Sequence, residues 1–531
     1  MASTKPEKSN GVFLTQSQSI PDFDPPKKPK RNYYAFACSF LASTTSILLG
    51  YDIGVMSGAI IFIQKDLHIT DVQKEVVMGV FSLYSLIGSA VAGRTSDLVG
   101  RRLTIVFAGV IFFVGALLMG LSTNYAFLMV GRLVAGIGVG YALMIAPVYT
   151  AEVAPASQRG FLLSFPEAFI NIGLLLGYVS NLAFSGLPTH IGWRLMLGIG
   201  VVPSTLITAM ILIMPESPRW LVMQGRLGEA KQVLDKISDS PEESKLRLDD
   251  IKAAAGIPEH IHDDIVSVSK KNSGEGVWRE IFLHPTPAVR HILLCALGIH
   301  FFEMATGIES VVLYSPEIFT RAGIRDDTHK LLATMAVGVV KTLFVFIGAF
   351  QLDRIGRRPL LLTSVAGCFL CLLGLATGLH FIGQSEERLV WAVTLCVVSI
   401  MCYVAVFDIG FGPITWVYSS EIFPLRLRAQ GCSLAIAANR VTSALFSMTF
   451  ISLYKAISIG GTFFLYAGIT AIAWVFFYTL YPETRGRTLE EMEDLFGTFF
   501  KWRSTVRALD EKKLGDGVNG QVQKGNVDTK G

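Results

Sequence analysis

Charged side chains inside long apolar stretches are the residues of this sequence whose types could do chemistry. Asp52 lies between Gly50 and Gly54 in one apolar run, and Arg132 lies in another. A lone carboxylate in apolar surroundings is costly, so Asp52 must hold a proton or find a cation. Arg132 is the obvious candidate for that cation. A static salt bridge that only joins two helices is the alternative interpretation.

Polar residues also recur at helical spacing in three further apolar runs. They are Glu167, Asn171, Leu174, Tyr178 and Asn181 in the first, Glu303, Thr306, Ser310 and Tyr314 with Glu309 alongside in the second, and Asn439, Ser443 and Ser447 in the third. Steps of three and four residues place each set on one face of a helix. Three polar faces that converge on one cavity suit an uncharged ligand rich in hydroxyl groups. Hydrogen bonding between helices is the alternative for the serines and threonines, but it explains the glutamates poorly.

Two aromatic residues are candidates for the same ligand, because the C–H face of a sugar or polyol packs on an aromatic ring. Phe411 and Trp416 lie beside Gly412 and Pro413, where a break would let the helix flex. Ordinary packing is the alternative for either ring.

Composition shows which elements must position these residues. The chain has 531 residues, of which 51% are hydrophobic and 17% charged, whereas a soluble globular chain carries roughly 25% charged residues. This excludes a soluble enzyme with one water-facing surface. A membrane span needs about 20 apolar residues. Five charge-free runs are long enough, at 76–93, 103–121, 195–214, 360–379 and 461–480. Seven more carry buried charge, near 33–63, 125–149, 161–184, 292–318, 331–352, 389–418 and 432–453.

The sequence therefore predicts an all-α polytopic membrane protein with twelve transmembrane helices. The two halves also repeat each other. The matching stretches are GRTSDLVGRR (93–102) with QLDRIGRR (351–358), AEVAPASQRG (151–160) with SEIFPLRLRAQG (420–431), and PESPR (215–219) with PETRGR (482–487). Such parallel repeats place a substrate site between the halves at mid-membrane, with alternating access by rocking.

The repeat predicts five segments. They are an N-terminal tail (1–32), a six-helix bundle (33–214), a helical linker (215–288), a second six-helix bundle (289–481) and a C-terminal tail (482–531). Lys and Arg are concentrated in the short loops on one side, which is therefore the cytoplasmic side. Both tails and the linker then lie in the cytoplasm. We expect a multi-pass protein of the plasma membrane.

The repeated motifs contain acids and arginines that can pair at the cytoplasmic helix ends. The eight residues are Asp97, Arg101, Glu152, Arg159, Asp353, Arg357, Glu421 and Arg428. One interpretation is a cytoplasmic gate whose ion pairs stabilise the outward-facing state. The alternative is that these charges only set the orientation in the membrane and solvate the loops.

Several stretches resemble the sugar porter family of the major facilitator superfamily. They are GYDIGVMSGA (50–59), GRTSDLVGRR (93–102), PESPRWL (215–221), LDRIGRRP (352–359) and PETRGRTLEEME (482–493). Within that family, FPEAFINIG (165–173) and HFFEMATGIESVVLYSPEIF (300–319) resemble the plant polyol/monosaccharide–proton symporters. The resemblance implies the major facilitator fold and a proton-coupling role for Asp52 and Arg132, in which the aspartate takes the proton.

The sequence departs from the family pattern at the expected sugar site. Many sugar porters have glutamine or asparagine where this chain has Glu167, Glu303 and Glu309. A tryptophan of the family is replaced by Phe411, and a glutamine by Asn439. A carboxylate accepts hydroxyl hydrogen bonds more strongly than an amide, which favours open-chain polyols or a broader substrate range.

Ten residues are candidates for substrate binding. They are Glu167, Asn171, Tyr178, Glu303, Glu309, Tyr314, Lys341, Phe411, Trp416 and Asn439. We include Lys341 as the candidate cation for Glu309 or another of these acids.

The predicted function is proton-coupled symport of polyols (of the sorbitol, mannitol, xylitol and inositol type) and monosaccharides. A passive facilitator and a non-transporting sugar sensor are the alternatives. No catalytic or metal-binding set of residues stands out, so we expect no enzyme activity and no cofactor other than the proton as coupling ion. The expected partners are a small neutral polyhydroxylated substrate, protons and the lipid bilayer, without nucleic acid, and the expected working unit is a monomer.

Overall fold

A computed structural model gives the fold of the chain. It describes residues 32–154, 162, 164–255, 257–258, 263–266, 281, 283, 285–324, 326–385, 389–424, 427–484 and 495–496. The regular elements within these residues are all helices. One isolated antiparallel β-bridge also pairs Arg226 with Ile265. Twelve helices are long and apolar enough to cross a membrane, which confirms the predicted number.

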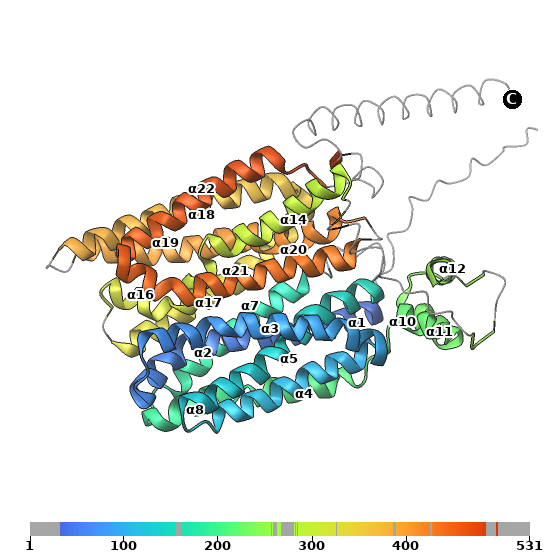
Figure 1. Cartoon of the computed structure of the whole chain (residues 1–531), viewed down its shortest axis with the longest axis horizontal. Coiled ribbons are helices and arrows are strands. Elements are labelled where there is room, and N and C mark those ends of the chain that lie inside the picture. The colour runs from blue at the N-terminus through green and yellow to red at the C-terminus, as the bar shows by residue number, and fades with distance from the viewer. Residues whose placement is uncertain are drawn as a thin grey trace, which may run out of the picture.

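The first half of the chain forms one bundle, and the second half forms another beside it (Figure 1). The first bundle contains α1 (Tyr33–Ser43), η1 (Thr44–Ser46), α2 (Ile47–Leu67), α3 (Asp71–Val99), α4 (Arg101–Gly120), α5 (Tyr125–Val153), α7 (Phe165–Phe184), α8 (Thr189–Gly198) and α9 (Val201–Ile211). The second contains α14 (Pro287–Ala305), α15 (Ile308–Leu313), α16 (Ser315–Arg321), α17 (Asp327–Ile355), α18 (Arg357–Gln384), α19 (Val390–Ile409), α20 (Phe411–Ile422), α21 (Arg428–Ile457) and α22 (Ile459–Leu480).

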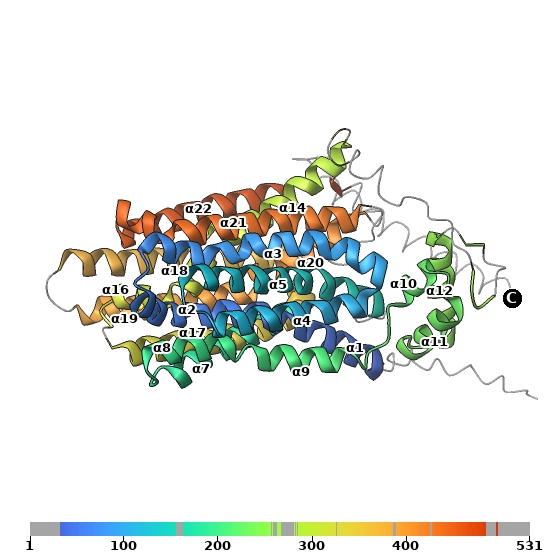
Figure 2. The same ribbon diagram turned by 60° about the horizontal axis from the view of Figure 1, so that its bottom comes forward.

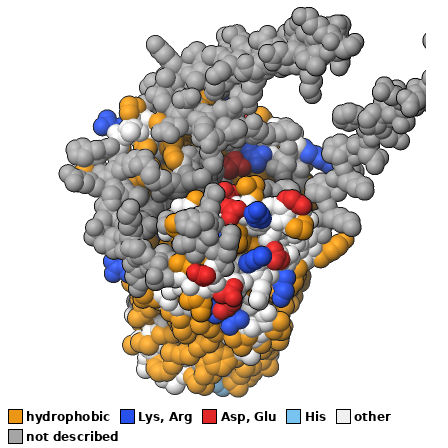
Figure 3. All heavy atoms as spheres, turned by 90° about the vertical axis from the view of Figure 1, so that its right-hand side faces the viewer, with side chains coloured by type: hydrophobic (Ala, Val, Ile, Leu, Met, Phe, Trp, Pro, Cys, Tyr) orange, Lys and Arg blue, Asp and Glu red, His pale blue; other side chains and the backbone are white. Residues whose placement is uncertain are grey.

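Three short helices lie in the described part of the segment that connects the bundles. They are α10 (Pro218–Met223), α11 (Leu227–Ile237) and α12 (Pro241–Ala255), and they lie beyond one end of the bundles in both views (Figure 1, Figure 2). We call this the linker end, and the opposite end, near α8 and α16, the distal end. Figure 3 shows acidic and basic side chains gathered at the linker end, next to a flank covered by hydrophobic side chains. This distribution is typical of a bundle embedded in lipid with one polar end in water.

The sequence repeat is also a structural repeat. Gly100 and Gly356 end α3 and α17 with φ of +105° and +100°, a conformation that favours glycine. The next helix begins at once in both halves. Its first backbone N–H groups, at Arg101 and Arg357, donate to the carboxylates of Glu216 and Glu483, respectively. PESPR and PETRGR therefore each supply an anion to the N-terminus of a helix.

Glycines allow α2 and α7 to pack in backbone contact. A Cβ added to Gly50 would lie 1.8 Å from the carbonyl oxygen of Ile170, and one added to Gly54 would lie 2.3 Å from that of Leu174. On the other side, a Cβ on Gly173 would meet the carbonyl oxygen of Ile47. This contact places Asp52 in a tightly packed helix pair.

Among the interrupted spans, the seventh and the tenth break in the second bundle. The seventh span ends α14 at Ala305 and resumes as α15 after Gly307, whose φ is +89°. The tenth span breaks at Gly410, between α19 and α20. The break expected at Gly412 and Pro413 therefore lies two residues earlier, and Pro413 occupies the first turn of α20, where its missing N–H has no intrahelical partner to lose.

Substituting Gly54 tests the close packing of α2 and α7. Because the new methyl group of Gly54→Ala would clash with a backbone carbonyl, we expect a loss of about 1–3 kcal/mol in stability. The measurement is the melting temperature of the purified protein in detergent. Gly468→Ala in α22, where a Cβ would meet nothing within 4 Å, is the matched control and should not lower it. A Gly54→Ala protein that melts with the parent would contradict the packing.

Candidate functional site

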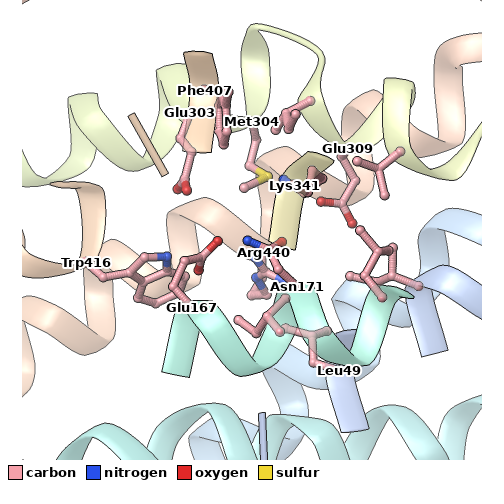
Figure 4. A pocket seen from close by; sticks show the side chains of 15 residues that line it. Leu49, Glu167, Asn171, Glu303, Met304, Glu309, Lys341, Phe407, Trp416 and Arg440 are labelled. Atoms are coloured by element: carbon pink, nitrogen blue, oxygen red, sulfur yellow. The ribbon is translucent and has the colours of Figure 1, made fainter. Parts of the chain in front are cut away.

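Both bundles line a cavity between the broken seventh and tenth spans. The described lining residues come from α2, α7, α14, α15, α17, α19, α20 and α21; they are Leu49, Ile53, Glu167, Ile170, Asn171, Leu174, Glu303, Met304, Ile308, Glu309, Val312, Lys341, Phe407, Trp416 and Arg440. Figure 4 shows the carboxylates of Glu167 and Glu303 and the guanidinium of Arg440 directed into the same space. The cavity thus combines hydrogen-bonding groups of both charges with apolar and aromatic walls, the lining that binds small polar ligands.

Six of the ten predicted substrate residues line this cavity. They are Glu167, Asn171, Glu303, Glu309, Lys341 and Trp416. The glutamates come from opposite sides, since Glu167 is on α7 and the other two flank the break in the seventh span. A ligand here would contact both halves of the chain, which is what a site that controls their relative movement requires.

The structure does not place the other four among the described lining residues. Tyr178 and Tyr314 donate their hydroxyl protons to the carbonyl oxygens of Val312 and Ser447, at 3.0 and 2.7 Å. Phe411 is fully buried and packs against Phe407 and Phe477. Asn439 contacts the lining residue Glu303 from outside the cavity. Satisfying the polar group of a tyrosine inside a helix bundle uses up the hydroxyl that was expected to bind substrate.

Asn439 supports the wall instead. Its Nδ2 donates to Glu303 Oε2 at 2.7 Å, and its Oδ1 accepts from Arg440 Nε at 3.0 Å. Two serines of the predicted polar faces form hydrogen bonds between helices, as the alternative interpretation proposed, whereas the Ser447 hydroxyl has no partner among the described residues. Ser443 bonds to Ser82 across the two bundles at 2.9 Å, and Ser310 donates to the carbonyl oxygen of Phe446 at 3.4 Å.

The partner of Lys341 differs from the expectation. Its ammonium lies 2.9 Å from Asp408 Oδ1, and among the described residues this is its ion pair, rather than one with Glu309 or another glutamate of the cavity. Asp408 is fully buried one residue after Phe407, whose ring lies 5.4 Å from the same ammonium. Asp408 and Arg440 are functional candidates that sequence reasoning counted only as charges within spans. Their occurrence in apolar runs was the signal that could have assigned them a site.

Asp52 and Arg132 lie together beside the cavity. Arg132 donates to Asp52 Oδ2 at 2.5 Å, and each side chain is only 1% exposed. Arg132 also donates to the carbonyl oxygen of Val77 and lies 4.5 Å from the centre of the Phe81 ring. Asp52 Oδ1 has no hydrogen-bond partner among the described residues. An ion pair this dry is sensitive to protonation, because loss of either charge leaves the other unpaired.

The linker end contains the predicted gate residues in two separate sets. In the first half Arg101 pairs with Glu152 at 3.1 Å and with Asp97 at 3.2 Å. In the second half Arg357 pairs with Glu421 at 2.9 Å. Each of these pairs lies within one bundle. Arg159 lies outside the described residues, as do the side chains of Asp353 and Arg428, so their part of the gate stays a prediction.

The distal end is where described ion pairs cross between the bundles. Lys65 pairs with Asp327 at 2.8 Å, Lys74 with Glu317 at 3.4 Å, and Lys455 with Asp71. Glu75 also accepts hydrogen bonds from the backbone and the side chain of Ser452.

Glu317, in the short helix α16, shows how strongly these distal charges interact. Burial alone would raise the pKa of Glu317. The charges of Lys74 and Arg321 and a hydrogen bond from Tyr454 outweigh burial, so the pKa lies below its usual range. Glu317 is therefore ionised at neutral pH, and the bundles are held together at this end.

Comparison with known proteins identifies the family. A family model for sugar (and other) transporters matches residues 38–496. The chain belongs to this transporter family. It is 65% identical over 482 residues to polyol transporter 5 of Arabidopsis thaliana, and the alignment covers 91% of this chain and 89% of that protein. It is 32% identical over 453 residues to the glucose transporter GlcP of Staphylococcus epidermidis, and the alignment covers 85% of this chain and 95% of that protein.

Solved structures of the xylose transporter XylE share the fold. The proton:xylose symporter bound to 6-bromo-6-deoxy-D-glucose matches with a TM-score of 0.73 and 27% identity, covering 88% of this chain and all of that one. The inward open conformation from E. coli matches with a TM-score of 0.69 and 26% identity, covering 87% and 100%. The predicted major facilitator fold is confirmed. The chain is a multi-pass membrane transporter and not an enzyme.

Charge removal at Lys341 and Asp408 tests the buried pair. Asp408→Asn leaves the ammonium without its partner in an apolar wall, which we expect to cost about 3–5 kcal/mol of stability. The double variant Lys341→Gln/Asp408→Asn removes both charges and should melt closer to the parent. The measurement is thermal unfolding of four proteins in detergent: the parent, Asp408→Asn, Lys341→Gln and the double variant. A double variant whose loss equals or exceeds the sum of the single losses would contradict the pairing.

Proposed function

We propose that this protein is a proton-coupled symporter of polyols and monosaccharides that works by alternating access. The observation that carries the proposal is the buried Asp52–Arg132 pair beside a polar cavity shared by two bundles. Leu49 and Ile53, on either side of Asp52 in α2, line the cavity. A shift of α2 on protonation of Asp52 would therefore also shift the lining residues Leu49 and Ile53 at the substrate site.

The chemistry of the cavity supports neutral polyhydroxylated substrates. Three carboxylates and Asn171 offer acceptors for hydroxyl groups, and Trp416 and Phe407 offer rings for C–H faces. Polyol transporter 5 carries its substrate class in its name, and so does the proton:xylose symporter. Carboxylates accept hydrogen bonds more strongly than amides. They therefore favour open-chain polyols, whose flexible carbon chains can orient several hydroxyl groups toward the carboxylates of the cavity.

The transport cycle uses the two ends differently. The ion pairs between the bundles at the distal end favour a state that is closed there, and the polar pairs at the linker end hold each bundle together internally. We assign the linker end to the cytoplasm. This places both tails (1–32 and 482–531) and the linker (215–288) inside the cell and the bundles (33–214 and 289–481) in the plasma membrane, with one chain as the working unit.

A passive facilitator is the second candidate function. It would use the same cavity without a proton, so Asp52 discriminates between the two. The most informative experiment is uptake of labelled sorbitol, mannitol, xylitol, inositol and hexoses into proteoliposomes, with and without a proton gradient. Accumulation above equilibrium that requires the gradient supports symport. Equal uptake in both conditions identifies a facilitator.

Substitution of Asp52 separates coupling from transport. Asp52→Asn cannot take the proton, so we expect no uphill uptake of sorbitol, whereas exchange of labelled for unlabelled sorbitol continues. A gradient of one pH unit is worth about 1.4 kcal/mol, so a coupled parent should accumulate substrate about tenfold per unit. Retained exchange serves as the folding control. If the variant still concentrates sorbitol, Asp52 is not the coupling residue.

Glu309→Gln tests the substrate site. Loss of a hydrogen bond to a charged acceptor costs about 1.5–3 kcal/mol, so the apparent KM for the transported polyol should rise roughly 10- to 100-fold. Glu229→Gln, in the exposed part of linker helix α11, makes the same chemical change away from the cavity and should leave the KM unchanged. An unaltered KM for every polyol in Glu309→Gln would place the site elsewhere.

A further inference from the structure

A histidine lies directly behind the cavity wall and has no role in the proposed function. His300 precedes Glu303 by one turn in α14, and its Nδ1 lies 3.8 Å from Glu303 Oε2. The two side chains are 1% and 3% exposed. Glu303 lines the cavity, whereas His300 is not among the described lining residues. The pair therefore connects the wall of the cavity with the interior of the second bundle.

Hydrogen bonds fix which nitrogen of His300 carries a proton in the neutral ring. Its Nε2 lies 3.2 Å from Ser419 Oγ, and that hydroxyl already donates to the carbonyl oxygen of Thr415 at 2.8 Å. A hydroxyl has one proton, so while Ser419 donates to Thr415, its oxygen accepts and His300 Nε2 donates. A neutral ring then presents a bare Nδ1, which has no hydrogen-bond partner among the described residues.

Asn439, the hydrogen-bond donor next to Glu303, does not satisfy that nitrogen. The amide of Asn439 is oriented by Arg440, which donates to its Oδ1, so its Nδ2 donates to Glu303 Oε2. When Glu303 is ionised, two acceptors, the ring nitrogen and the carboxylate oxygen, face each other in a buried space. One added proton turns the repulsion between these two acceptors into attraction, and a hydrogen bond forms once the side chains close the 3.8 Å between them.

The charge balance of the cavity favours the same proton. Among the described lining residues, Glu167, Glu303 and Glu309 bring three negative charges. The cations are Lys341, which Asp408 already neutralises, and Arg440. The Arg440 guanidinium donates to Oδ1 of Asn439 and points into the same space as the carboxylates of Glu167 and Glu303 (Figure 4). Excess negative charge in a wall shielded from water is costly, and a bound proton reduces it.

We propose that His300 and Glu303 together bind a proton in the wall of the cavity, at a site separate from Asp52 and Arg132. Binding adds one proton to the space between Nδ1 and Oε2 and breaks no covalent bond. The site rests on the proposed function only in that the cavity is taken to be the substrate site. Because Glu303 faces that cavity, the affinity for substrate then depends on pH even when no gradient is present.

The charged groups around the His300–Glu303 pair belong to five other helices. They are Glu167 on α7, Glu309 on α15, Lys341 on α17, Asp408 on α19, Arg440 on α21, with the uncharged Ser419 on α20 and Asn439 on α21 as hydrogen-bond partners; α22 carries no Asp, Glu, Lys, Arg or His. The positive charge of Arg440 disfavours binding of the proton to the His300–Glu303 pair, whereas the negative charges of Glu167 and Glu309 favour it. Lys341 and Asp408 compensate each other.

Trp416 is a built-in reporter of this proton. Its ring meets the His300 ring edge-on, with centroids 5.3 Å apart. A charge gained or lost this close to an indole alters its fluorescence, whichever of the two groups holds the proton. The experiment is a pH titration of tryptophan emission from Asp52→Asn protein in lipid nanodiscs, without substrate. We expect one titration step, which disappears in Asp52→Asn/Trp416→Phe because the reporter is gone.

Removal of either member of the His300–Glu303 pair should abolish the step. The variants are Asp52→Asn/Glu303→Gln, which keeps the shape of the wall, and Asp52→Asn/His300→Asn, which leaves all lining side chains in place. Melting temperatures establish that both proteins are folded, and if one is not, the other decides. A Trp416-dependent step that survives in a folded variant, or its absence from Asp52→Asn, overturns the proposal. Failed transport does not affect this result, because neither substrate nor gradient is used.

The pH dependence of substrate affinity distinguishes proton binding from a purely structural role of His300, because a structural role would not alter that dependence. The KM for sorbitol exchange, measured with equal pH on both sides, should vary with pH in Asp52→Asn and become independent of pH in Asp52→Asn/His300→Asn. An unchanged pH profile in the His300 variant contradicts the shared proton.

Discussion

The cost of a charge inside a membrane protein is the constraint on which this structure depends. Asp52 and Arg132 offset that cost in the first bundle, and Lys341 and Asp408 do so in the second. Each pair joins two different spans, so each fixes the relation of a helix to its neighbour. The cavity glutamates differ, because they outnumber the cations that remain. These residues are the ones that need a proton or a hydroxylated ligand.

Backbone breaks and close packing then determine where those charges meet. Gly307 interrupts the seventh span between Glu303 and Glu309, which lets both carboxylates reach the same cavity. A Cβ at this position would lie 2.4 Å from the ring of Tyr466, so glycine satisfies both the conformation and the space. The tight contact of α2 with α7 ties the Asp52 segment to the helix that carries Glu167. In the proposed symport, the proton and the substrate therefore bind on two helices whose backbones are in contact.

Much of this arrangement could be predicted from the sequence, because apolar length and repeated motifs depend on local residue order. The twelve spans, the duplication and the family follow from such patterns. Helical spacing pointed to Glu167, Asn171 and Glu303, which line one cavity together with Glu309, and their role in binding stays a prediction. Tyr178 and Tyr314 are not among the described lining residues, because spacing gives the face of a helix but not which backbone carbonyl of a neighbouring helix lies within reach of a hydroxyl. The partner of Lys341 was missed for the same reason, since pairing depends on depth and on rotation of two distant helices.

Proton movement driven by substrate tests the symport proposal most directly. Proteoliposomes with equal pH and no potential across the membrane are mixed with sorbitol outside, and the pH of a weakly buffered external solution is recorded. Symport predicts alkalinisation outside as sorbitol enters, since each substrate brings a proton inward, and the signal should vanish in Asp52→Asn. Entry of labelled sorbitol at the parental rate without any change in external pH would contradict proton coupling.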